Sequence, residues 1–127
     1  MTHVFSVPLA LDPPTANSRL HWARRATITR RIRADCGVIA RSERIRLGVA
    51  DARKATSGPR RVHLTFVRPG QRGAHPVDGD ALPAKGKPVL DALKDAGWLL
   101  DDAEGYVSTT YSQERGHQLA VRVEVTV

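Results

Sequence analysis

The sequence predicts a small α+β domain with two helices and four strands in the order β-α-β-α-β-β, built around a mixed sheet. Three observations predict this class. Two segments repeat apolar residues at helical spacing, four shorter segments have the residue types of extended strands, and stretches rich in Gly, Pro and polar residues separate them. The length of 127 residues is that of one ordinary domain, so we expect a single domain over residues 1–127.

The first half of the chain predicts a strand, a loop and a long helix. Residues 3–9 form the expected strand, although Pro8 limits how far it can pair. Residues 12–18 have the composition of a loop. From residue 28 to residue 54, apolar side chains such as Ile28, Ile32 and Cys36 recur on one helical face. We expect this helix to break near Gly48, because glycine is a weak helix former.

The second half predicts a strand, a second helix and two further strands. Residues 62–67 alternate as a strand does, and residues 68–79 have the composition of a loop. The second helix is expected to begin with Asp80 as its N-cap, to kink near Pro88 and to end before Gly97. Residues 105–112 and 118–127 are the expected last strands, and residues 114–117 are interpreted as the hairpin turn that joins them.

Positive charge is the most informative bulk property. The chain carries 20 Lys and Arg against 13 Asp and Glu, a formal net charge of +7, which favours polyanionic partners. Ten of these basic residues lie between Arg24 and Lys54, among only three acids. Arg30, Arg33 and Arg41 fall opposite the apolar face of the expected helix, so we interpret them as contacts to a nucleic acid. The alternative is an ordinary solvated helix face.

The sequence also indicates where the protein works. It begins without the positive start and apolar run of a signal peptide, and no window approaches the roughly 18 apolar residues of a membrane span. The single cysteine, Cys36, excludes an intramolecular disulfide, which fits a reducing cytosol. We therefore expect a cytoplasmic protein with no membrane association.

Acidic residues gather at both ends of the second helix. Asp78 and Asp80 come before it, and Asp101 and Asp102 follow it. If the two ends meet over the sheet edge, the carboxylates repel one another unless a cation joins them. Hard oxygen ligands suit Mg²⁺, with Mn²⁺ as a substitute, and such a metal can assist attack on a phosphodiester. In the structural alternative, Asp80 is only an N-cap, Asp78 is a loop residue, and Asp101 and Asp102 form an exposed turn.

These residues resemble the RusA family of Holliday-junction endonucleases, found in bacteria and their phages. The family carries an aspartate pair in a D-x-D-N-L pattern, a lysine, a D-A-L or D-G-L segment, an A-G and a second aspartate pair. The matching stretches here are Asp78-Gly79-Asp80-Ala81-Leu82, Lys87, Asp91-Ala92-Leu93, Ala96-Gly97 and Asp101-Asp102. The run PPTANSRLHWARRATITR at residues 13–30 is similar to the family's N-terminal P-x-x-x-N segment, so the resemblance covers nearly the whole chain.

The resemblance implies a set of site residues. Asp78, Asp80 and Asp102 match the metal-binding carboxylates, with Asp101 as the less certain member of its pair, and Lys87 matches the catalytic lysine. Two departures concern this match. Ala81 stands where the family has asparagine, and the stretch between Asp80 and Asp91 is longer than in the best-known members. The extra length leaves Lys85 as a competitor to Lys87.

The resemblance also implies partners and an activity. Asn17, Arg19 and His21 are candidate DNA contacts, or else a capped loop before the first helix. Trp22 and Trp98 are expected in the core by residue type, with base stacking as the alternative. The implied function is a Mg²⁺-dependent endonuclease that resolves four-way DNA junctions by paired symmetric nicks in recombination and repair, as a homodimer, in a bacterial or phage-infected cell. Two alternatives remain: a nuclease selective for forks or flaps, and an inactive protein that binds branched DNA.

Overall fold

The computed structural model describes residues 1–15, 21–54, 59–70, 79–101, 105 and 107–127, with the backbone alone at residue 80. The elements follow the expected β-α-β-α-β-β order, with one short 3₁₀ turn added before the second helix. They are β1 (Thr2–Pro8), α1 (Trp22–Arg46), β2 (Arg60–Pro69), η1 (Gly79–Ala81), α2 (Leu82–Asp95), β3 (Val107–Gly116) and β4 (Ala120–Thr126).

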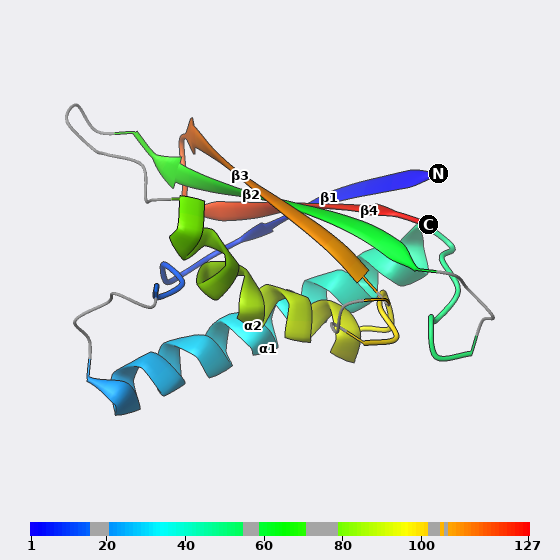
Figure 1. Ribbon diagram of the computed structural model, residues 1–127, viewed down its shortest axis with the longest axis horizontal. Helices are drawn as coiled ribbons and strands as arrows, with labels where there is room; N and C mark the ends of the chain where they lie inside the picture. The colour runs from blue at the N-terminus through cyan, green and yellow to red at the C-terminus, as the bar shows by residue number, and fades with distance from the viewer. Residues whose placement is uncertain (16–20, 55–58, 71–78, 102–104, 106) are drawn as a thin grey trace.

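The four strands form one mixed sheet in the spatial order β1-β4-β2-β3. β4 pairs antiparallel with both β1 and β2, whereas β2 and β3 run parallel. Figure 1 shows both helices on the same side of this sheet, with α1 and α2 packed side by side. The protein is therefore a two-layer α+β fold with a mixed sheet, as the sequence predicts.

The expected hairpin between the last two strands is wrong. Glu114 and Gly116 belong to β3, and β2 lies between β3 and β4 in the sheet. Residues 117–119 connect the two strands past the end of β2. The four residue steps from Gly116 to Ala120 can span about 13 Å, whereas two strand spacings measure roughly 10 Å. A connection this short can therefore pass the end of β2. Alternation along each strand does not specify its neighbour.

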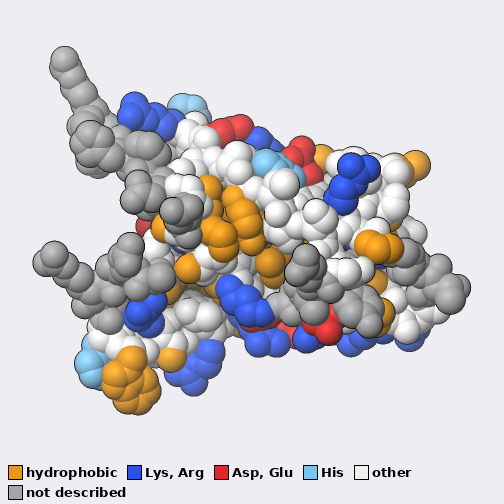
Figure 2. All heavy atoms as spheres, viewed as in Figure 1, with side chains coloured by type: hydrophobic (Ala, Val, Ile, Leu, Met, Phe, Trp, Pro, Cys, Tyr) orange, Lys and Arg blue, Asp and Glu red, His pale blue; other side chains and the backbone are white. Residues whose placement is uncertain are grey.

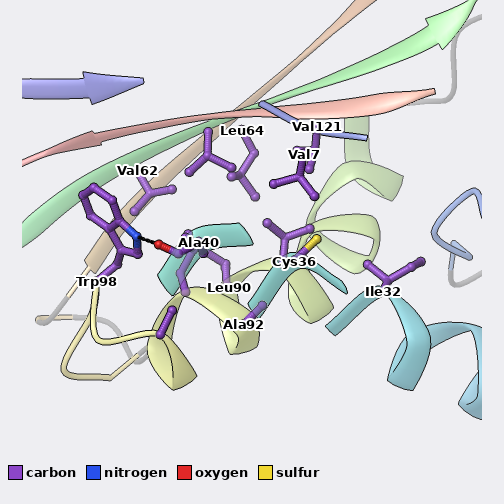
Figure 3. Close-up of a cluster of buried hydrophobic side chains, with 14 of the residues drawn as sticks. Val7, Ile32, Cys36, Ala40, Val62, Leu64, Leu90, Ala92, Trp98 and Val121 are labelled. Carbon is purple, nitrogen blue, oxygen red and sulfur yellow. Dashed lines mark hydrogen bonds between the residues drawn. The ribbon is translucent and has the colours of Figure 1, made fainter. Parts of the chain in front are cut away.

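The core fills the space between the sheet and the two helices. Val7, Leu64 and Val121 point from the sheet toward Ile32 and Leu90 on the helices (Figure 3). Alternate residues of β2 and β4 face this layer, which explains the period-two pattern in their sequences. Burial raises the pKa of the Cys36 thiol to about 12, so Cys36 is a packing residue with no thiolate character at neutral pH.

Helix α1 begins six residues earlier than the apolar pattern indicates. His21 precedes it, and its Nδ1 accepts a hydrogen bond from the backbone N–H of Ala23 at 3.2 Å. A side-chain acceptor at this position satisfies one of the free N–H groups of a first helical turn. The helix ends at Arg46, and Gly48 follows with φ of +70°. The expected break near Gly48 is thus confirmed, and residues 49–54 lie beyond the helix.

Helix α2 ends as the sequence predicts and begins differently. At its end, Gly97 has φ of +85°, and Trp98 N–H donates to the carbonyl of Leu93 at 2.9 Å, which closes the helix through a left-handed glycine. At its start the N-cap position is Ala81, without a side-chain cap. The expected N-cap role of Asp80 is wrong, because the 3₁₀ turn of η1 moves the helix start past it.

Candidate functional site

Helix α2 separates the two acidic segments. Asp80 lies in η1, directly before the first turn of α2, whereas Asp101 lies beyond its last turn, with its carboxylate 3.9 Å from Lys94 Nζ. The 14 residues of α2 rise by about 21 Å. Within one chain, Asp80 and Asp101 therefore lie too far apart to share an ion, since Mg²⁺ needs its oxygen ligands at about 2 Å. For these two residues, the condition that both ends of the helix meet within one chain is not fulfilled.

The other two predicted ligands cannot be placed with them. Asp78 and Asp102 lie outside the described residues. In the described part of the chain, no three His, Cys, Asp or Glu side chains gather closely enough to hold a metal ion. The carboxylates have the chemistry that Mg²⁺ prefers.

The segment that leads to Asp101 is fixed on both sides. Arg60, which is buried, donates from Nη1 to the carbonyl of Trp98 at 2.6 Å, and Arg44 Nε donates to the carbonyl of Ala96 at 2.7 Å. Trp98 is fully buried, and its indole N–H donates to the carbonyl of Ala40 at 2.7 Å (Figure 3). The expected core position of Trp98 is confirmed. These contacts hold the start of the acidic segment against α1 and β2.

The two candidate lysines of α2 have different surroundings. Lys85 is 1% exposed, and its Nζ lies 2.7 Å from Asp12 Oδ1, 3.2 Å from the carbonyl oxygen of Pro13 and 5.7 Å from the centre of the Phe66 ring. It therefore lies between the helix and the sheet, at the apolar side of α2. Lys85 thus links α2 to the segment that follows β1.

Lys87 lies on the outer side of the helix. Its side chain is 59% exposed, and its Nζ is 3.1 Å from Asp91 Oδ1, one helical turn later. Lys87 and Asp91 thus share one face of α2, as their spacing of four residues requires. Burial raises the pKa of the nearby Tyr111 hydroxyl, and the positive charge of Lys87 partly opposes that rise. Of the two lysines, only Lys87 is accessible to a phosphodiester without a rearrangement of the core.

The arginines predicted to bind DNA line a surface groove along α1. The groove has a volume of about 430 Å³ and is lined by Arg30, Arg33, Ala34, Gly37, Val38, Arg41, Asp95 and Ala96. Figure 2 shows Lys and Arg side chains spread along the edge of the molecule that α1 forms, with acidic side chains between some of them. The charges that line the groove are mixed, since Asp95 stands among the three arginines.

Arg33 differs from its two neighbours in this groove. It forms a bidentate pair with Asp95, with N–O distances of 2.7 and 2.9 Å, and approaches Asp91 at 3.9 Å. The hydrogen bond from Arg33 lowers the pKa of the Asp95 carboxyl. Because Arg33 already joins α1 to α2, Arg30 and Arg41 are the better candidates for phosphate contact in this groove.

The predicted contacts before α1 are only partly described. Asn17 and Arg19 lie outside the described residues. His21 caps α1, which is the structural alternative that the sequence left open, and a DNA contact by His21 stays a prediction. Trp22 corrects an expectation, because its side chain is 75% exposed and not in the core.

Sequence reasoning also missed Asp12. It looked like an ordinary loop residue, yet it meets both Lys85 and Arg68, whose Nη2 lies 3.6 Å from Asp12 Oδ2. A lysine at the apolar side of an amphipathic helix was the available signal, since a buried ammonium needs an anionic partner. No local pattern around Asp12 identifies it as that partner.

Comparison with known proteins adds no relative. No family model matches the chain, and no curated protein matches it. The resemblance to RusA endonucleases therefore depends on the motif residues of the sequence itself. In the described part of the chain, no helix is both long and apolar enough to cross a membrane.

Proposed function

We propose that this protein is a Mg²⁺-dependent endonuclease that cuts four-way DNA junctions. The observation that carries the proposal is the combined pattern from Asp78 to Asp102, in which two aspartate pairs flank a helix with an outward lysine. The net charge of +7 and the arginines of the α1 groove favour a phosphodiester substrate. The fold, with its β-α-β-α-β-β order, agrees with the resemblance but does not by itself specify an activity.

We further propose that the working form is a homodimer with composite sites. Asp80 and Asp101 of one chain are separated by the length of α2, so one ion needs the Asp78–Asp80 end of one chain and the Asp101–Asp102 end of another. A two-fold dimer makes two such sites, which suits two symmetric cuts. The second copy then contributes part of each site.

The chain's own residues have distinct tasks in this proposal. Asp78, Asp80, Asp101 and Asp102 would hold Mg²⁺, or Mn²⁺ as a substitute, which when bound activates water and polarises the phosphodiester. Lys87 would stabilise negative charge that develops on the phosphate, as a fixed cation near the reacting group can. Arg30 and Arg41 would position the DNA backbone. Ala81, in place of the family's asparagine, removes one polar side chain beside this site.

A cleavage assay tests the proposal against its two alternatives. The wild-type chain is mixed with a mobile four-way junction, a fork and a linear duplex, with Mg²⁺, Mn²⁺ or EDTA. Paired symmetric nicks in the junction alone, dependent on the metal, are the expected result. Preferred cutting of the fork would favour the fork nuclease, and tight junction binding without cleavage would favour the inactive binding protein.

The carboxylate variants complete the assay. Asp78→Asn, Asp80→Asn and Asp102→Asn should each abolish cleavage and leave junction binding intact or tighter, because each loses a ligand and a negative charge near DNA. Full cleavage by any one of them at saturating Mg²⁺ would remove that residue from the site.

A further inference from the structure

The two tryptophans have opposite environments. Trp98 is fully buried, whereas Trp22, the first residue of α1, is 75% exposed and is the most exposed large apolar side chain of the described residues after Met1. Its indole lies against the His21 imidazole, with ring centres 5.5 Å apart and planes at 36°. Because His21 also caps the helix, this aromatic pair is attached to the rigid first turn of α1. A single exposed apolar side chain is ordinary on a protein surface, but tryptophan and arginine together are the residue types that most often anchor a contact.

The surroundings of Trp22 are cationic. The first 12 residues of α1 contain five arginines and no acid. Arg31 pairs with Asp35 and Arg33 with Asp95, so Arg24, Arg25 and Arg30 supply the positive charge on the Trp22 side of the helix. Arginines in the first turn oppose the positive end of the helix dipole, so they raise the local positive potential further. A second copy of this chain that docked the same patch would bring arginines against arginines. An anionic partner with an apolar planar surface avoids this repulsion and can also cover the exposed ring.

We infer that Trp22 is a stacking platform for an unstacked nucleobase at the branch point of the DNA substrate. A nucleobase offers a π-face, and its phosphates complement the nearby arginines, which together explain the exposed ring and the charge around it. The inference depends on the proposed function for its substrate, branched DNA. It adds a contact to the base at the branch point, whereas the groove arginines contact only the backbone.

Intrinsic fluorescence tests the contact directly, because only one of the two tryptophans is exposed. The full-length chain is titrated with a four-way junction in EDTA, so that no cleavage occurs. Stacking on a base should quench the Trp22 emission, and the Trp22→Phe chain, whose remaining Trp98 is buried, should show no such quenching. Unchanged wild-type emission at saturating junction would overturn the inference.

Affinities of matched variants provide the second readout. Trp22→Ala should weaken junction binding by about 5- to 150-fold, as loss of one stacked base does, while Trp22→Phe keeps most of the affinity. The control Ile45→Ala, another exposed apolar side chain of α1 at 64%, should have no effect. Affinity for linear duplex, which offers no unstacked base, should change little in all three variants.

Other outcomes separate the inference from the proposed function. An equal loss for junction and duplex, or equal loss in Trp22→Ala and Trp22→Phe, would overturn the stacking contact. A Trp22→Ala chain that sediments as a monomer, when the wild type is a dimer, would assign Trp22 to the contact between copies and overturn it as well. If the junction is cleaved but the Trp22 emission is not quenched, only the stacking contact is rejected. If the emission is quenched but the junction is not cleaved, only the proposed nuclease function is rejected.

Discussion

Lys85 and Asp12, 73 positions apart in the sequence, form an ion pair in which Lys85 Nζ lies 2.7 Å from Asp12 Oδ1. The ammonium is 1% exposed and the carboxylate 42% exposed, so the pair reaches from the core to the surface. It joins the beginning of α2, which follows Asp78 and Asp80, to the segment that precedes Asn17 and Arg19. This geometry gives Lys85 a structural role and leaves Lys87 as the exposed member of the two candidate lysines.

The first prediction separates the two lysines. Lys87→Ala should slow single-turnover cleavage by at least about 100-fold, typical of the loss of one preorganised electrostatic group, with little change in stability because the side chain is 59% exposed. Lys85→Ala should lower the free energy of unfolding by about 2 kcal/mol through the cavity it leaves. Urea denaturation and cleavage at saturating enzyme would measure both effects. Lys85→Ala should slow cleavage much less than Lys87→Ala does. If Lys85→Ala slows cleavage more, Lys85 would be the catalytic residue.

The second prediction compares the three arginines of the α1 groove, Arg30, Arg33 and Arg41. Arg30→Gln with Arg41→Gln should reduce the slope of log K against log salt by about 1.8, because each phosphate contact contributes about 0.9. Arg33→Gln should change the slope little and lower stability by less than about 1 kcal/mol, since its pair with Asp95 is half exposed. Junction binding between low and moderate salt would measure the slopes. An unchanged slope in the double variant would mean that this face is merely solvated.

The third prediction tests the turn that ends α2. Gly97→Ala should destabilise the protein by more than about 1 kcal/mol, because φ is +85° and a Cβ would lie 2.8 Å from the Asp51 carboxyl carbon. Gly37→Ala is the matched control. It lies inside α1 with no neighbouring atom near its added Cβ, and should stabilise by about 0.5–1 kcal/mol. Thermal denaturation of both variants checks the signs, and stabilisation by Gly97→Ala would contradict the geometry.

Local patterns predicted the elements of the fold better than their arrangement. The alternation of residues 118–127 and the glycine at position 97 each depend on near neighbours, and both expectations agree with the structure. The order of strands in the sheet depends on contacts between distant segments, so nothing near residue 116 showed that the chain passes β2. Helix α1 begins before Ile28 because its first turn is capped by His21, although residues 22–27 carry no apolar stripe.

The sequence pattern singled out the residues of the candidate site, but it did not indicate how they lie relative to one another. The aspartate pairs and Lys87 follow from sequence pattern alone, and the outward position of Lys87 follows from its helical spacing to Asp91. Whether the two acidic ends could meet within one chain depended on the length of α2, which the sequence pattern around Pro88 did not fix. The environment of Trp22 was missed because residue type favours burial of a tryptophan, whereas the local charge around it opposes burial.

The last prediction tests whether each site combines two chains. One chain carries Asp80→Asn, and a second carries Asp101→Asn with Asp102→Asn. Each alone should be inactive. If the sites are composite, a purified heterodimer of the two has one intact site, made by Asp80 of the second chain and Asp101–Asp102 of the first. It should nick one strand of the junction at about half the wild-type rate, since one of two symmetric sites survives. A heterodimer of Asp78→Asn and Asp80→Asn chains is the matched control, because both substitutions affect the same end and no intact site can form. An inactive first heterodimer would mean that the acidic ends do not combine between chains, because every site within a single chain would then carry a substitution.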